Sequence, residues 1–223
     1  VSSLRPPYRP RLLLKQMETL GVNSFPVILI TAGFTGAVLA LQSYTAFKRF
    51  NAAGLMGALV ALSMTRELSP VLTGLMVAAR VGSAMAAELG TMRVTEQIDA
   101  LETLATDPFQ YLVAPRMYAC TISVPILALL GDFLGILGGY IVAVKMLSVN
   151  STIYMNSTFE YIDMYDITNG MIKAAFFGFA LAIISCHQGF TTRGGAAGVG
   201  RSTTQAVVLS CMTIFISDYF LTA

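Results

Sequence analysis

Residues 19–47 contain no charged side chain and are mostly apolar. Since an α-helix rises about 1.5 Å per residue, this stretch is long enough to cross a hydrocarbon layer of about 30 Å. Composition points the same way: a soluble domain carries about 25% charged residues, whereas this chain of 223 residues has 12% charged and 55% hydrophobic residues. The sequence therefore predicts an all-α integral membrane protein whose first span covers residues 25–47.

Further apolar stretches have the length of membrane spans. We expect them at residues 55–87, 118–144, 167–190 and 202–223, which gives about five transmembrane helices in a single domain of residues 1–223. The polar residues 145–168 predict an extramembrane loop. At the start of the chain, basic residues accompany a stripe of Leu13, Met17 and Leu20, which predicts an amphipathic interfacial helix at residues 4–21.

The basic residues predict the orientation of the chain, because cytoplasmic loops of membrane proteins are enriched in Lys and Arg. With a cytoplasmic amino terminus, eight basic residues lie inside and three or four lie outside. This orientation places the polar residues 88–108 and a Gly-rich turn at residues 195–202 in the cytoplasm. The loop at residues 145–168 then lies outside.

Residues 88–108 form the longest polar, helix-compatible segment of the chain. At 100° per residue one stripe of such a helix is apolar and the opposite side is acidic. The apolar stripe holds Val94, Ile98, Leu101 and Ala105, and the acidic side holds Glu96, Asp99 and Glu102. Asp107-Pro108 would end the helix. The segment is either an ordinary solvated helix or a docking element for a partner outside the membrane.

The second span is interrupted by the charged residues Arg66, Glu67 and Arg80. Ionisable groups inside a membrane are costly, so they usually face a bundle interior or a wet cavity. One interpretation is a structural ion pair that holds helices together. The other places Arg66 in a cavity, where its guanidinium group binds an anionic headgroup. Pro70 would free a backbone carbonyl nearby and bend the helix.

Small residues recur at a spacing of four in two of the predicted spans. Such spacing lets another helix approach closely, so we expect both spans to pack against protein on at least one face. The positions are Ala78, Gly82, Ala86 and Gly90 in the second span, and Gly131, Gly135 and Gly139 in the third.

The sequence offers no site for chemistry. Its net charge of +2 and the lack of basic runs argue against nucleic-acid binding, and its three cysteines form no C-x-x-C pair. The single His187 predicts no metal site, and no nucleophile lies beside a base. Residues 195–202 nearly match a phosphate-binding loop, but Arg201 replaces the lysine and a membrane helix precedes it. We therefore expect a flexible connection there, and no catalytic site, metal or cofactor in this chain.

Several motifs carry a family resemblance. Arg66-Glu-Leu-Ser-Pro-Val, Ala79-Arg-Val-Gly-Ser-Ala, the run at residues 87–101, and residues 107–116 from Asp-Pro to Pro-Arg resemble the MlaE (YrbE) family of permeases. These permeases belong to ABC transporters that move lipids and work with MCE proteins. The sequences of residues 185–200 and of Ser202-Thr-Thr-Gln-Ala-Val-Val are similar to those of the cyanobacterial and plastid branch of the family.

The resemblance implies a coupling helix at residues 93–107 that sits in a groove of a separate ATPase, which binds ATP and Mg. Its contact residues would be Glu96, Gln97, Asp99, Leu101, Glu102 and Asp107. It also implies that two permeases pair, with phospholipid in a cavity between them beneath an MCE ring. Arg66, Glu67 and Pro70 would line that cavity. The membrane would be the bacterial inner membrane or, for a plastid protein, the chloroplast inner envelope.

The expected function is therefore that of a non-enzymatic permease subunit of a lipid ABC transporter. An alternative is a self-contained secondary transporter or channel, driven by an ion gradient through Asp132, Lys173 and Asp218. A third is a membrane anchor for a lipid-binding partner.

Overall fold

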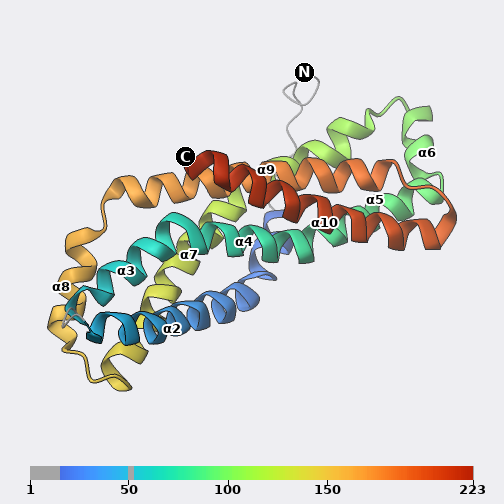
Figure 1. Cartoon of the computed structure of the whole chain (residues 1–223). Coiled ribbons are helices and arrows are strands. Elements are labelled where there is room, and N and C mark those ends of the chain that lie inside the picture. The colour runs from blue at the N-terminus through green and yellow to red at the C-terminus, as the bar shows by residue number, and fades with distance from the viewer. Residues whose placement is uncertain (1–15, 50–52, 223) are drawn as a thin grey trace. The chain divides into compact units, whose positions relative to one another are not determined.

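A computed structural model describes residues 16–49 and 53–222 of the chain (Figure 1). Within these residues every regular element is a helix. Five helical stretches are long and apolar enough to cross a membrane: Glu18–Arg49, Met56–Val94, Phe109–Lys145, Met164–Phe190 and Gly195–Thr222. The prediction of an all-α membrane protein with about five spans is confirmed.

The first crossing stretch joins a π-helical turn η2 (Glu18–Val22) to α2 (Phe25–Arg49), and a short 3-10 turn η3 (Ala53–Leu55) precedes the second. The third joins η6 (Phe109–Val113) to α7 (Ala114–Lys145). The fourth and fifth are α9 (Met164–Phe190) and α10 (Gly195–Thr222).

The second crossing stretch contains two wide turns. Three α-helical segments, α3 (Met56–Ser63), α4 (Ser69–Val77) and α5 (Ser83–Val94), are joined by the π-helical turns η4 (Met64–Leu68) and η5 (Ala78–Gly82). Arg66 lies in η4 and Arg80 lies in η5. Since π turns inside α-helices are rare and often found at functional sites, these two turns are candidate functional positions.

The chain divides into two compact units. Unit 1 comprises residues 1–24, 74–124 and 175–223, and unit 2 comprises residues 25–73 and 125–174. Each unit has its own buried core.

In unit 2, glycines let α7 approach α2, α3 and the start of α4 closely. A Cβ at Gly36 would overlap the carbonyl of Gly135, and one at Gly139 would lie 2.8 Å from Val60 Cγ1. A Cβ at Gly131 would lie 2.7 Å from the Ser69 hydroxyl. The glycine spacing in α7 therefore falls at close helix contacts, around a core that includes Met56, Val60, Met64 and Tyr154.

In unit 1, α5 packs beside α10 and close to α9. Ala78 and Ala86 are fully buried. A Cβ at Gly82 would lie 2.9 Å from the Ser185 hydroxyl, and one at Gly90 would lie 2.9 Å from the Thr192 hydroxyl. A core of Leu89, Ile98, Leu112 and Cys186 closes this unit near α6 (Gln97–Thr103). The small residues of the second span thus face protein.

Three segments differ from the sequence prediction. Residues 145–168 are not only a loop, since they hold the helix α8 (Ser151–Tyr161), which Asn150 caps by accepting the backbone N–H of Thr152 at 2.9 Å. Residues 195–202 are not a flexible turn but the first two turns of α10. A close fold-back explains this glycine content, because a Cβ at Gly198 would overlap the carbonyl of Arg193.

The helix expected at residues 93–107 is the third difference. The structure continues α5 to Val94, turns at Thr95 and Glu96, and forms α6 only over Gln97–Thr103. Glu96 has a φ of 60°, a left-handed conformation that breaks a helix. Most of the interfacial helix expected at residues 4–21 lies outside the described residues. Within its last part, Leu20 is buried in η2.

Candidate functional site

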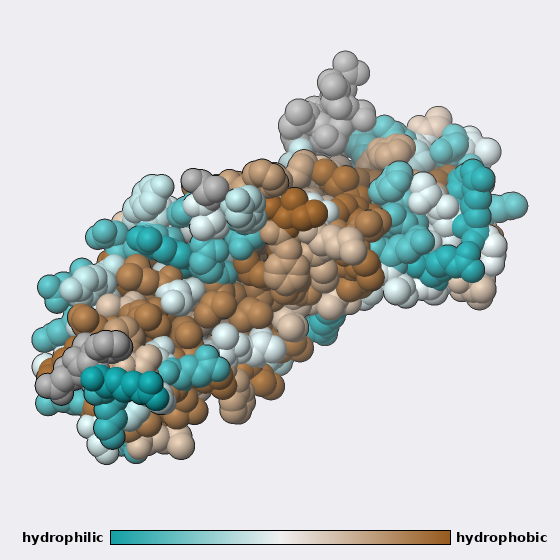
Figure 2. Space-filling view, in the orientation of Figure 1, coloured by the Kyte–Doolittle hydropathy of each residue, from teal (hydrophilic) through white to brown (hydrophobic). Residues whose placement is uncertain are grey.

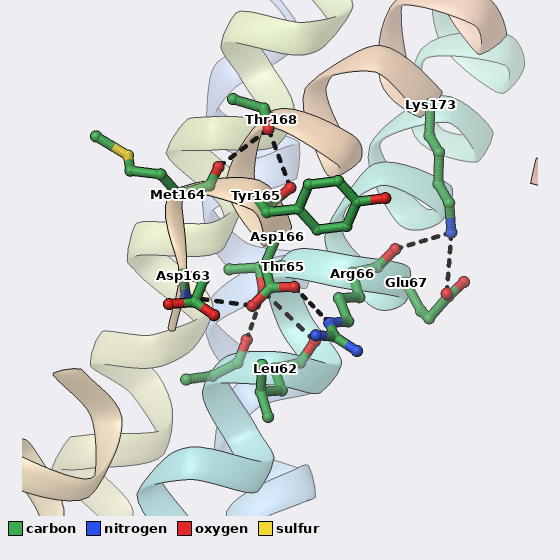
Figure 3. A network of polar contacts seen from close by, with 11 residues as sticks. Leu62, Thr65, Arg66, Glu67, Asp163, Met164, Tyr165, Asp166, Thr168 and Lys173 are labelled. Carbon is green, nitrogen blue, oxygen red and sulfur yellow. Dashed lines mark hydrogen bonds and ion pairs between the residues drawn. The ribbon is translucent and has the colours of Figure 1, made fainter. Parts of the chain in front are cut away.

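The π-helical turn η4 projects two opposite charges from the second crossing stretch. Arg66 and Glu67 are neighbours in sequence, and each forms an ion pair with a residue of α9 (Figure 3). Adjacent residues on a helix point about 100° apart, so the two pairs form at different positions along α9. The site therefore joins η4 to α9 entirely within unit 2.

Arg66 is paired with Asp166 in the first turn of α9. Its Nε donates to Asp166 Oδ1 at 2.6 Å. The other carboxylate oxygen accepts the backbone N–H of Asp163 at 3.2 Å, so Asp166 also caps the start of α9. The Asp166 side chain is only 2% exposed, whereas that of Arg66 is 53% exposed. Within the described residues, the guanidinium group makes no other hydrogen bond, so its terminal amino groups remain available to a ligand.

Glu67 is paired with Lys173, two turns further along α9. Lys173 Nζ donates to Glu67 Oε1 at 2.9 Å and to the backbone carbonyl of Arg66 at 3.1 Å (Figure 3). The side chain of Lys173 is 2% exposed and that of Glu67 is 37% exposed. In both pairs, therefore, the buried charge comes from α9 and the more exposed charge comes from η4.

Pro70 explains why Lys173 contacts the Arg66 carbonyl. In an α-helix this carbonyl would accept the N–H of residue 70, and proline has none. Lys173 supplies the missing donor. The carbonyl that the sequence predicted to be freed is thus satisfied by a charged side chain. Pro70 itself is buried and does not present a surface to a ligand.

Gly170 brings α9 close enough for both pairs. It lies between Asp166 and Lys173 in α9, and a Cβ there would overlap the carbonyl of Thr65. Sequence analysis missed Gly170 and Asp166. The available signal was the spacing of seven between Asp166 and Lys173, which puts an acid and a base on one helix face opposite the base and acid of η4.

The six expected ATPase contacts lie together on the segment from Glu96 to Asp107, but not as one helix face. Glu96, Gln97, Asp99, Glu102 and Asp107 are exposed, and Leu101 is half-buried against the core of unit 1. Asp99 is paired with Arg93, and Asp107 Oδ1 accepts the N–H of Phe109 at 2.9 Å. Figure 2 shows hydrophilic surface around α6.

The same segment also exposes apolar side chains that the sequence prediction left out. Leu104 is 74% exposed. Phe109, two residues after this segment, is exposed as well and stacks on Phe190 with ring centroids 5.3 Å apart. An acidic segment with exposed apolar residues is suited to a protein partner.

Arg116 and Glu88 form a further pair in unit 1, with Nη2 to Oε2 at 2.7 Å. Arg116 is buried and Glu88 is exposed. Both residues lie in the motifs that resemble the MlaE family, but nothing in the sequence predicts that they pair.

The described residues hold no group of three or more His, Cys, Asp and Glu side chains that could bind a metal. Of the residues that an ion-driven transporter would use, Lys173 is engaged by Glu67, and Asp132 is buried.

Comparison with known proteins gives a consistent family. The family model described as Permease MlaE matches residues 13–223. A probable ABC transporter permease protein of Rickettsia felis is 53% identical over 221 residues, which are 99% of this chain and 85% of the relative. One of Synechocystis is 49% identical over 208 residues, 93% of this chain and 79% of the relative.

The intermembrane phospholipid transport system permease protein MlaE of Haemophilus influenzae is 42% identical over 213 residues, 95% of this chain and 82% of the relative. The Synechocystis protein is more similar to this chain than the H. influenzae protein is. The resemblance to the MlaE family and to its cyanobacterial branch is confirmed.

Proposed function

We propose that this chain, which belongs to the MlaE permease family, is the membrane-spanning subunit of an ABC transporter that moves phospholipid or another polar lipid between membranes. One observation carries the proposal. Arg66 lies in a membrane-crossing stretch, is held through Nε by the buried Asp166, and has a side chain that is 53% exposed.

The chemistry of Arg66 suits a lipid headgroup. A guanidinium group donates two parallel hydrogen bonds to a phosphate, and Arg is preferred over Lys for such contacts. Because Asp166 fixes the Nε side of the group, the exposed side is oriented before a ligand arrives, which reduces the entropy lost on binding. Glu67 is half-exposed beside Arg66 and would contact a cationic headgroup amine.

The energy for transport would come from a separate ATPase. The segment from Glu96 to Asp107 is exposed, acidic and partly apolar, and it would dock in that subunit, where ATP and Mg would bind. By family analogy, a second copy of this chain would complete the lipid cavity and an MCE protein would receive or deliver the lipid. The membrane would be the bacterial inner membrane, or the chloroplast inner envelope for a plastid protein.

The lipid site can be tested with Arg66→Lys. Lysine keeps a positive charge beside Asp166 but lacks the second set of donors, so the fold should persist while phospholipid bound to the purified complex falls several-fold. The measurement is phosphorus per permease after detergent washing. Arg201→Lys, at an exposed position of α10, is the matched control and should change nothing. Equal phospholipid in wild type and Arg66→Lys would refute the site.

The ATPase contact can be tested with the double variant Glu96→Arg and Glu102→Arg. Both side chains are exposed, so the fold should tolerate the change while the ATPase no longer co-purifies. Glu160→Arg, an exposed acid of α8, is the control. Transport by the chain alone in liposomes under an ion gradient, without any ATPase, would instead establish the secondary-transporter alternative.

A further inference from the structure

The second crossing stretch has an unusual exposed surface. Between Met56 and Arg93 no large hydrophobic side chain is exposed. Each of the other crossing stretches exposes several, for example Phe34 of α2, Phe133 of α7, Ile172 of α9 and Phe215 of α10. Since lipid acyl chains favour contact with apolar side chains, the exposed face of the second stretch is not suited to the acyl region of the bilayer.

On that face η5 and α5 present one cation among small residues. Arg80 is exposed, and so are Ala79 and Ala84, while Ser83 and Ala87 are half-exposed. Arg80 forms no ion pair with any described residue. Small neighbours leave its guanidinium group accessible from the side.

Arg80 lies 14 residues before Val94, the last residue of the second crossing stretch, which is about 21 Å along the helix axis. Glu88, eight residues further along the helix, is about 12 Å closer to that end of the stretch than Arg80 is. Long basic side chains can extend to the interface only from positions near it. An unpaired guanidinium group at this depth therefore requires an anion or a water-filled space.

No carboxylate of α5, α6 or α10 forms an ion pair with Arg80. Glu88 is engaged by Arg116, and Asp99 by Arg93. Asp218 lies at a different position along the helix axes. A Cβ at Gly74 would lie 3.4 Å from Ile214, so these two residues are level with each other. Because α10 runs antiparallel to α5, Asp218, one turn after Ile214, lies on the side of Gly74 that faces away from Arg80. Along the helix axes, Arg80 and Asp218 are separated by about 15 Å.

A second copy of the chain would not supply the anion either. Copies related by rotation about the membrane normal keep each residue at its own depth. The depth of Asp218 in another copy would therefore differ from that of Arg80 by the same amount as within one copy. In such a pair two Arg80 side chains would lie at the same depth and repel each other unless an anion lay between them.

We propose that Arg80 binds the phosphate of a phospholipid headgroup, at a site separate from the one at Arg66. This inference rests on the proposed lipid-transport function and adds a second headgroup position to it, 14 residues further along the second crossing stretch. A phosphate diester carries one negative charge and accepts two parallel hydrogen bonds from a guanidinium group.

The test uses the full chain in its complex, with a photoreactive benzophenone amino acid replacing Ala84, one turn from Arg80 on the exposed face. The complex is supplied with phosphatidylglycerol or with diacylglycerol of the same acyl chains. We expect phosphatidylglycerol to crosslink about tenfold more than diacylglycerol, the fold-change for one charge-assisted interaction. Arg80→Gln should abolish that preference, and Arg80→Lys should keep only part of it, because lysine retains the charge but not the second parallel donor.

Three results would overturn the proposal. The first is an unchanged phosphatidylglycerol crosslink in Arg80→Gln. The second is loss of the crosslink in the presence of excess inorganic phosphate, which would indicate a free-phosphate site. The third is a crosslink from position 84 to a second copy of the chain in place of lipid. The Arg66→Lys variant separates the two proposals. A phosphatidylglycerol crosslink lost in Arg80→Gln but kept in Arg66→Lys supports the Arg80 site even where the Arg66 site fails.

Discussion

Arg66 and Arg80 occupy the same place in two similar turns of one helical stretch. Each is the third residue of a π-helical turn, η4 or η5. Arg66 meets a buried acid, because Gly170 lets α9 approach η4 and bring Asp166 to it. The neighbour of η5 in unit 1 is α10, and no carboxylate there pairs with Arg80. The same local structure thus holds a cation that is paired with an acid, Arg66, in η4 and a cation without such a partner among the described residues, Arg80, in η5.

The difference separates two uses of a charge inside a membrane. An anchored guanidinium group is already partly neutralised, so it contributes to the fold and offers only its remaining donors. An unanchored group contributes little to the fold and depends on a ligand for its neutralisation. Stability measurements and ligand measurements should therefore rank the two arginines in opposite orders.

The largest expected effect is the loss of stability in Arg66→Ala. This change leaves the buried Asp166 carboxylate without its cation, which costs about 3 kcal/mol, whereas Arg80→Ala should cost less than about 1 kcal/mol. The measurement is the free energy of unfolding in detergent by denaturant titration. Adding Asp166→Ala to Arg66→Ala should restore part of the loss. Equal costs for the two single variants would remove the contrast between the turns.

An intermediate effect is expected for Lys173→Met. Methionine fills similar space but leaves Glu67 and the Arg66 carbonyl without their donor, so unfolding should become easier by about 2 kcal/mol. Combining it with Glu67→Gln should recover roughly half of this loss. Lys145→Met, at an exposed end of α7, is the control. A loss no larger than that of the control would mean that the second pair does not support η4.

The smallest effects concern the hydroxyl groups beside the two turns. Thr65 donates to the Ala61 carbonyl at 3.0 Å from a buried position, and Ser83 donates to the Arg80 carbonyl at 3.0 Å from an exposed one. Thr65→Val should cost about 1 kcal/mol and Ser83→Ala about 0.5 kcal/mol or less. The same unfolding titration compares them, and a larger cost for Ser83→Ala would show that η5 is the more constrained turn.

Sequence reasoning found the membrane spans and the charged turn, because both depend on local composition. A long uncharged apolar stretch has few alternatives to a spanning helix, and charges inside such a stretch are visible at once. Even the carbonyl freed by Pro70 follows from the chemistry of proline. Its partner Lys173 did not follow, because that contact depends on how α9 packs.

The features that sequence reasoning missed are decided by tertiary contacts. Asp166 lies in a polar segment typical of a loop, and only its contact with Arg66 shows that it is buried. The glycines at the start of α10 have low helix propensity, yet Gly198 permits the close approach to Arg193. The break at Glu96 requires a left-handed residue that no periodic pattern reveals.

The two wide turns also affect how this stretch can be compared with other sequences. A π turn holds one residue more than the α-helical turn it replaces, so η4 and η5 act as two single-residue insertions in a continuous helix. Each shifts the phase of the positions that follow by about 100°. A helical wheel drawn through residues 56–94 without correction therefore assigns residues after Leu68, and again after Gly82, to the wrong side. Deleting one residue from either turn would leave a regular α-helix in which the residues beyond it keep their present faces.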